Sequence, residues 1–235
     1  MPFTQYHFDL SPTEFRDTLA LRYRRPLSGV PANCDGCNEQ FTLIHALDCK
    51  RGGLVVQRHN EVRDALGDLA SLVWNKLTRE PIVQEADDAA NTPALVADLG
   101  VRGLWQPQAE ALIDVRVIDT DAQSHCHRPI TSVLASAETE KKRKYHHACE
   151  RRRAAFTPFV VSVDGILGKE AKTLIDRLSD RLASKWGKSY EETVSWVRTR
   201  LSFAVLRATD LCIWGSRTRW RSLGIHDGAT MSLCM

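Results

Sequence analysis

The sequence predicts an α/β protein in which a mixed β-sheet carries helices on both faces. One reason is the order of its periodic segments, which is helix, three strands, helix, strand and two further helices. The other reason is composition. The chain has 235 residues, of which 43% are hydrophobic and 26% charged, as expected for a globular protein with one large core or two smaller ones.

Residues 1–57 are predicted to form an N-terminal segment with one short helix and a Cys/His-rich module. The helix is expected within SPTEFRDTLALRYR, because Ser11 and Glu14 have the spacing of a capping box. The first core helix is expected in RHNEVRDALGDLASLVWNKL, residues 58–77, where apolar residues recur at helical spacing. Short strands are then expected at residues 81–85, 95–105 and 110–119.

The remaining elements complete a main domain over residues 58–215. They are expected to be a helix at 131–152, a strand at 155–165 closed by Asp-Gly, and two amphipathic helices at 168–186 and 190–213. The last two helices would cover the sheet. Residues 216–235 show no period and are expected to be a disordered tail.

The net charge of +3 is mild but unevenly placed. Residues 140–153 hold seven Lys or Arg against two Glu, and residues 198–221 hold six Arg against one Asp. Such runs indicate either solvated helix faces or a surface that binds phosphates. No apolar run approaches the length of a bilayer span, and the N-terminus lacks the features of a secretory signal, so an intracellular protein without a membrane partner is expected.

Three of the seven cysteines cluster with a histidine in CDGCNEQFTLIHALDC. Cys34 and Cys37 are separated by two residues, and His45 and Cys49 are four apart, which places them on one face of a short helix. Four such ligands form a closed tetrahedral Zn²⁺ site, which is structural and not catalytic. His59 is the reserve fourth ligand. The alternative is three buried thiols and an incidental histidine.

Two aspartates interrupt apolar strand segments. Asp114 lies in ALIDVRVID, residues 111–119, and Asp98 lies in LVADLGV, sixteen residues earlier. A hairpin around Pro107 would place the strands side by side with both carboxylates on one face. Burying a charge is costly unless it is paired or bound to a metal, so the two residues predict a site for a hard cation such as Mg²⁺. Such an ion can activate water for phosphodiester cleavage.

These motifs together resemble the PD-(D/E)xK, or restriction-enzyme-like, endonucleases. Their core has a helix, three strands, a helix and a strand, with the first Asp on the second strand and the second acidic residue on the third. The closer resemblance is to the C-terminal part of site-specific non-LTR retrotransposon proteins, where a Cys-Cys-His-Cys knuckle precedes such an endonuclease. It covers about residues 21–217 and is carried by the knuckle, RHNEV at 58–62, Asp98, Asp114 and the Lys/Tyr helix at 141–145.

The resemblance implies a PD-(D/E)xK nuclease-like core, a structural Zn²⁺, a catalytic Mg²⁺ and a nuclear location. The chain departs from the family pattern at Ala97, where the family usually has proline before the first Asp, and at Arg116, where the D-x-K version has lysine. Arginine is effectively always protonated, so Arg116 can hold a phosphate or pair with Asp114 but cannot serve as a base.

The retrotransposon version implies that the catalytic lysine lies on the following helix. Its Lys-x2-Lys-Tyr pattern is matched by Lys141, Lys144 and Tyr145, which share one helix face. Lys141 is the first choice, and Lys142 and Lys144 compete with it. Glu61 on the first core helix is expected to assist, because an acidic residue from this helix can approach the metal in related nucleases.

The sequence therefore predicts a Mg²⁺-dependent DNA endonuclease. Asp98 and Asp114 would hold the metal and Lys141 would polarise the attacking water or the phosphate, while Tyr145 and Arg116 would position the strand. In a retrotransposon the nick provides a 3′ end that primes reverse transcription, so a reverse-transcriptase region outside this chain is an expected partner, with RNA as a second candidate ligand. The alternatives are a non-catalytic nucleic-acid-binding module and a zinc-stabilised protein-interaction domain.

Overall fold

A computed structural model describes residues 8–23, 25–86 and 93–215. Its centre is a four-stranded sheet with the strand order β1-β4-β5-β6. The strands are β1 (Leu77–Arg79), β4 (Leu99–Arg102), β5 (Glu110–Ile118) and β6 (Ala155–Ser162). The first three pair antiparallel, and β6 runs parallel to β5. The predicted α/β fold with a mixed sheet is confirmed.

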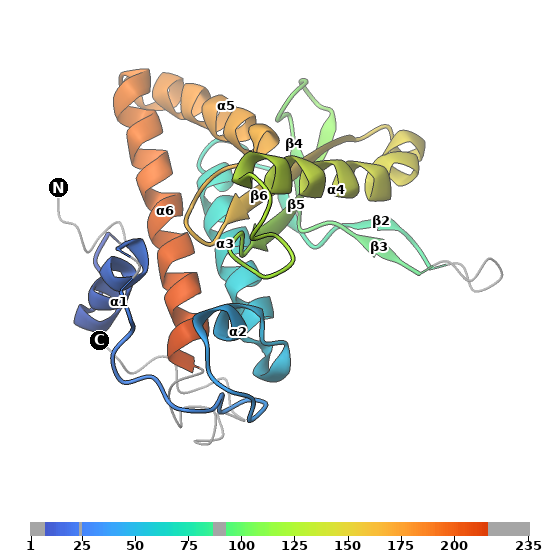
Figure 1. The fold of residues 1–235 in the computed structure, drawn as a ribbon. Coiled ribbons are helices and arrows are strands. Elements are labelled where there is room, and N and C mark those ends of the chain that lie inside the picture. The colour runs from blue at the N-terminus through green and yellow to red at the C-terminus, as the bar shows by residue number, and fades with distance from the viewer. Residues whose placement is uncertain (1–7, 24, 87–92, 216–235) are drawn as a thin grey trace, which may run out of the picture.

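Helices cover both faces of this sheet (Figure 1). α3 (Leu54–Ser71), α5 (Lys169–Trp186) and α6 (Tyr190–Gly215) share one hydrophobic core with the sheet, and α4 (Ile130–Arg152) packs on the other face. On β5, Ile113 and Val115 face the first core, whereas Leu112 and Ile118 face α4. Because side chains alternate along a strand, the even-numbered Asp114 and Arg116 belong to the α4 side.

The N-terminal elements pack on α6. α1 (Pro12–Arg22) begins with the predicted capping box of Ser11 and Glu14, and α2 (Leu43–Asp48) is followed by a short 3₁₀ helix, η2 (Arg51–Gly53), that leads into α3. Both α1 and α2 contact α6. Leu47 and Leu54 are buried with Cys212 near the C-terminal end of α6, so this helix joins the N-terminal segment to the main body.

One predicted strand does not pair with the strands of the main sheet. The segment expected at 81–85 forms β2 (Ile82–Gln84), which pairs with β3 (Leu95–Val96) in a separate two-stranded ribbon outside the main sheet. The first sheet strand is β1 instead. Glu80 has a φ of +50° and Pro81 has no N–H to donate, so the chain turns out of the sheet at this point.

The expected strand at 95–105 is divided between the two sheets. The Ala97 N–H donates to the Pro81 carbonyl (3.1 Å), next to the ribbon, whereas Asp98 already pairs with β5. The tail predicted at 216–235 lies outside the described residues. No helix in the described part of the chain combines the length and apolar character that a bilayer-spanning segment needs.

Candidate active site and metal-binding module

The hairpin of β4 and β5 brings Asp98 to the part of β5 that carries Asp114. The Asp98 N–H donates to the Ile113 carbonyl (3.1 Å), and Asp98 Oδ2 accepts from the Val115 N–H (2.6 Å). Asp98 therefore contacts the residues on both sides of Asp114. The Val115 N–H lies beyond the end of β4, which begins at Leu99. The Asp98 side chain therefore accepts this N–H in place of a backbone carbonyl of β4.

The other oxygen of Asp98 contacts α3. His59 Nε2 lies 2.9 Å from Asp98 Oδ1. The Asp98 side chain is 17% exposed, and the His59 ring is partly exposed beside it. Asp98 is thus held by one helix and one strand, and one side of its carboxylate remains open to solvent.

Asp114 is held from the opposite side, by α4. The Tyr145 hydroxyl lies 2.5 Å from Asp114 Oδ1 and 2.6 Å from the Val96 carbonyl, and Lys141 Nζ forms an ion pair with Asp114 Oδ2. Lys141 and Tyr145 are four residues apart, so both reach the sheet from one helix face. The Asp114 side chain is 7% exposed, and this pairing answers how a carboxylate can lie in an apolar strand.

Tyr145 is a rigid, protonated donor. Its ring is buried and stacks on Phe156, with the ring centres 4.5 Å apart and an interplanar angle of 13°. Burial raises the pKa of its hydroxyl, and the Asp114 carboxylate, with a smaller contribution from Asp98, raises it further. The hydroxyl therefore keeps its proton and orients Asp114.

The three competing lysines of α4 have different partners. Lys141 contacts Asp114, whereas Lys142 Nζ pairs with Glu170 Oε1 (2.6 Å) on α5. Lys144 is exposed, with Nζ 5.3 Å from the centre of the Tyr145 ring. Of these three lysines, only Lys141 forms an ion pair with one of the two aspartates.

A pocket of about 370 Å³, called the edge pocket below, is lined by His59, Val115 and Lys141, which contact the two aspartates, although neither aspartate lines it. β5 continues past the start of β4, which leaves its residues 115–117 without a neighbouring strand on that edge, between α3 and α4. The lining contains five basic side chains and one acidic one: Arg58, His59, Arg116, Lys141, Lys144 and Glu140. Since Glu140 is paired with Arg116 (2.6 Å), the remaining charge of the pocket is positive.

Arg116 and Glu61 differ in whether they reach the edge pocket. Arg116 pairs with Glu140 and not with Asp114, although it does line the edge pocket. Glu61 is exposed and is not part of the pocket lining. The residue of α3 that reaches Asp98 is His59, two positions earlier, and residues two apart on a helix point about 200° away from each other. In the sequence, His59 was part of the RHNEV motif and the reserve zinc ligand, with no predicted contact to Asp98.

The Cys/His module, residues 34–49, is built by two local structures. A tight turn after Cys34 is closed by hydrogen bonds from the Cys34 N–H to the Glu39 carbonyl (2.7 Å) and from the Asn38 N–H to the Cys34 carbonyl (2.8 Å). Asn38 adopts a φ of +65° there, which asparagine tolerates better than most residues. His45 lies in the first turn of α2, where the N-cap Thr42 accepts its N–H (3.0 Å).

This module brings its four predicted ligand atoms within 4.8 Å of one another. Cys49 Sγ lies 3.9 Å from both Cys34 Sγ and Cys37 Sγ, and Cys37 Sγ lies 3.1 Å from His45 Nε2. Zinc-to-sulfur bonds of about 2.3 Å in a tetrahedron require sulfur atoms about 3.8 Å apart, so the sulfur spacing fits a zinc ion. The module could therefore hold a metal, with His45 and not His59 as the histidine.

The thiols of the module differ in acidity. Burial opposes ionisation of Cys34, but N–H groups of Gly36 and Cys37 and the neighbouring His45 outweigh it and lower its pKa to about 7. Burial raises the pKa of Cys49 to about 11, and the nearby sulfurs of Cys34 and Cys37 add to this effect. All three cysteines are free thiols. A bound cation would compensate the crowded negative charge and favour the thiolate form of each.

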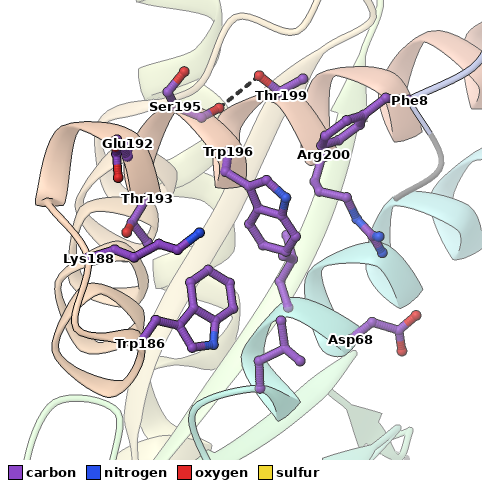
Figure 2. A pocket seen from close by; sticks show the side chains of 12 residues that line it. Phe8, Asp68, Trp186, Lys188, Glu192, Thr193, Ser195, Trp196, Thr199 and Arg200 are labelled. Carbon is purple, nitrogen blue, oxygen red and sulfur yellow. Dashed lines mark hydrogen bonds between the residues drawn. The ribbon is translucent and has the colours of Figure 1, made fainter. Parts of the chain in front are cut away.

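A second, larger pocket of about 870 Å³ lies away from both sites, at the junction of α3, α5 and α6. Figure 2 shows its two indole rings, Trp186 and Trp196, which meet edge to face with centres 5.1 Å apart. The Arg200 guanidinium lies 5.8 Å from the centre of the Trp196 ring. Its lining contains none of the predicted catalytic or metal-binding residues.

Comparison with known proteins finds no family model that matches this chain and no curated protein that matches it in sequence. The function is therefore inferred from the chemistry of the two sites described above and from the resemblance of their motifs.

Proposed function

We propose that this protein is a metal-dependent endonuclease that cleaves DNA, with Asp98 and Asp114 as ligands of a divalent cation such as Mg²⁺. The observation that carries the proposal is the meeting of these two residues at one point of β5, with Lys141 in contact with Asp114. A basic pocket lies directly beside them. This combination suits a reaction on a phosphodiester, because carboxylates can bind a hard cation while cationic side chains receive the phosphate.

The order of elements supports a PD-(D/E)xK nuclease-like core. α3 precedes the three antiparallel strands β1, β4 and β5, which are followed by α4 and the parallel strand β6. Asp98 lies directly before the second of these sheet strands, and Asp114 lies in the third. These are the strand positions at which the resembled family carries its acidic residues.

The contacts of the two carboxylates indicate how a cation would be accommodated. Two neighbouring carboxylates repel each other; the Lys141 ammonium compensates the charge of Asp114, and His59 Nε2 contacts Asp98 Oδ1. If the two carboxylates held a divalent cation, the Lys141 ammonium and the His59 ring would be free to contact a phosphate. The cation would supply an activated water and stabilise negative charge on the phosphate.

The proposed reaction is hydrolysis of one phosphodiester bond. A water oxygen forms a bond to phosphorus, the bond from phosphorus to the 3′ oxygen breaks, and a proton from the water ends on that oxygen. The products are a 3′-hydroxyl and a 5′-phosphate. In this reaction Lys141 stabilises the charge that develops on the phosphate, Arg116 holds the strand, and Tyr145 keeps Asp114 in place through its hydrogen bond.

The substrate and the biological setting rest on the resemblance to the endonucleases of non-LTR retrotransposon proteins. They comprise DNA as the substrate, a target nick that primes reverse transcription, a reverse-transcriptase region outside this chain and a nuclear location. We also propose that the Cys/His module binds one structural Zn²⁺ through Cys34, Cys37, His45 and Cys49, because its ligand spacing fits a tetrahedral site.

Plasmid nicking with two adjacent lysine variants tests the proposal. We expect the protein to convert supercoiled plasmid to open circles in Mg²⁺ and not without a divalent cation. Lys141→Ala should slow nicking at least about a hundredfold, the usual lower range for loss of such a group. Lys142→Ala, which removes the neighbouring cation paired with Glu170, should leave the rate within about twofold. Equal rates for the two variants would exclude the assigned role of Lys141.

A non-catalytic nucleic-acid-binding module is the second candidate. One observation favours it: every carboxylate oxygen of Asp98 and Asp114 already contacts a protein group. In that case the two aspartates would be structural, and the basic surface alone would bind the nucleic acid. Binding that falls steeply with salt, together with an absence of cleavage in both Mg²⁺ and Mn²⁺, would favour this candidate over the nuclease.

A further inference from the structure

Arg58 is a buried cation whose partners do not neutralise it. Its side chain lies on α3 and is 4% exposed. One terminal nitrogen donates to the Leu47 carbonyl (2.9 Å), whereas Nε has no hydrogen-bond partner among the described residues. No ion pair of Arg58 occurs in the described part of the chain. Burial of a guanidinium in this condition is costly unless an anion compensates it.

The surroundings of Arg58 provide only partial compensation. Arg58 acts electrostatically on Asp119, the residue after β5: burial raises the pKa of this carboxyl, and the charge of Arg58 opposes the increase only in part. The edge pocket that Arg58 lines is otherwise basic, because its single carboxylate, Glu140, is paired with Arg116. An anion in the edge pocket would therefore meet a guanidinium that is already held in place and has an Nε donor that is free among the described residues.

We propose that Arg58 binds a backbone phosphate of the nucleic-acid strand in the edge pocket, and that the Cys/His module orients Arg58 for this contact. The inference rests on the proposed function, since it concerns a phosphate next to the one that is cleaved. A strand whose scissile phosphate lay at Asp98 and Asp114 would continue past the open edge of β5 into this pocket, which Val115, Arg116 and Val117 line. Arginine suits this contact because its planar fork can donate two hydrogen bonds to one phosphate.

The module orients Arg58 through one carbonyl group. Leu47 lies in α2 between His45 and Cys49, two of the four predicted metal ligands. A helix of six residues has little stability by itself, so a metal bound by these ligands would fix α2, and the Leu47 carbonyl would then fix the Arg58 fork. In this arrangement the module acts on the strand indirectly, as a support for Arg58.

The salt dependence of binding to a fluorescent DNA duplex, measured without divalent cations other than zinc, tests the phosphate contact. We expect Arg58→Gln to reduce the slope of log K against log salt by about 0.9, which corresponds to one lost phosphate contact on duplex DNA. Arg79→Gln is the matched control, since Arg79 on β1 pairs with Asp64 and Asp68 and should leave the slope unchanged. An Arg58→Gln slope equal to that of the unmodified protein overturns the inference.

Further variants and ligands complete the test. If Arg58→Gln does not fold, as judged by circular dichroism, Arg58→Lys replaces it, and the inference requires weaker binding with an unchanged slope because the charge remains but the fork is lost. Competition by inorganic phosphate distinguishes a strand phosphate from a free one. Displacement of the duplex by about 1 mM phosphate would overturn the proposed ligand. A change in slope without any nicking activity would keep this inference and refute the nuclease.

The orienting role of the module has its own measurement. Zinc is removed from the protein and then restored at one equivalent, and the salt slope is measured in both states. We expect restored zinc to increase the slope by about 0.9 in the unmodified protein and to leave it unchanged in Arg58→Gln. An equal increase in both proteins would mean that the module contacts the nucleic acid directly, which contradicts the indirect role.

Discussion

The hydroxyl of Tyr145 offers a sharp test of how Asp114 is held. Tyr145→Phe removes one oxygen and keeps the ring, which continues to stack on Phe156. The lost oxygen lies 2.5 Å from Asp114 Oδ1 and 2.6 Å from the Val96 carbonyl, and the Asp114 carboxylate is nearly buried. The variant thus isolates the hydrogen bond from the packing of the ring.

The expected loss follows from the burial of the two acceptors. A hydrogen bond to a charged group contributes about 1.5–3 kcal/mol, and a buried acceptor without a donor costs about 1–3 kcal/mol. Lys141 continues to compensate the other oxygen of Asp114, so the lower half of this range applies. We expect Tyr145→Phe to lower the free energy of unfolding by about 1.5–2 kcal/mol.

Urea unfolding followed by circular dichroism measures this loss, with the same dependence of the free energy of unfolding on urea concentration in both proteins. Tyr190→Phe is the matched control, because its hydroxyl bonds Asp176 (3.2 Å) at the surface and the residue is 40% exposed. That variant should change the free energy of unfolding by less than about 0.5 kcal/mol. A Tyr145→Phe protein as stable as the Tyr190→Phe protein would refute the idea that the Tyr145 hydroxyl stabilises the buried Asp114 carboxylate.

Two further predictions concern α5 and the Cys/His module. The buried Glu138 side chain on α4 accepts the Glu170 N–H (2.9 Å) at the start of α5, and burial raises the pKa of Glu138. The stability that Glu138 contributes is therefore complete below its unfolded-state pKa and is lost as pH rises through its folded-state pKa. Glu138→Gln should therefore gain stability relative to the unmodified protein as pH rises above about 4.5, measured by thermal unfolding across pH; a constant difference would refute this. The purified protein should contain one equivalent of zinc, and its removal should lower Tm by at least about 5 °C, whereas metal-free protein with an unchanged Tm would contradict a structural role.

Local sequence patterns predicted those helices, strands and residue clusters that lie within one short segment of the chain. The alternation in β5 and the helical period around Lys141 and Tyr145 predicted their elements within one residue at most ends. The ligands of the Cys/His module lie within sixteen residues, so their spacing alone predicted a cluster. The hairpin of Asp98 and Asp114 was also predictable, because only a short turn separates their strands.

Features that depend on contacts between distant segments could not be predicted in this way. β1 has three residues, which is too short to show an alternation, so the longer apolar segment 81–85 was assigned to the sheet in its place. α3 contacts α6, the sheet and η2, and its sequence does not indicate which face meets which partner. Glu61 was selected from the resemblance, whereas the contact of His59 with Asp98 and that of Arg58 with Leu47 depend on this packing.

The most direct test of the proposed site is the location of a divalent cation in crystals of the protein with duplex DNA, soaked in Mn²⁺ and examined by anomalous diffraction. The proposal predicts a peak bridged by carboxylate oxygens of Asp98 and Asp114, with Lys141 moved from Asp114 toward a phosphate, and loss of that peak in Asp114→Asn. If the DNA lies across the edge pocket but no peak forms between the two aspartates, and Lys141 remains paired with Asp114, the metal-dependent mechanism is wrong.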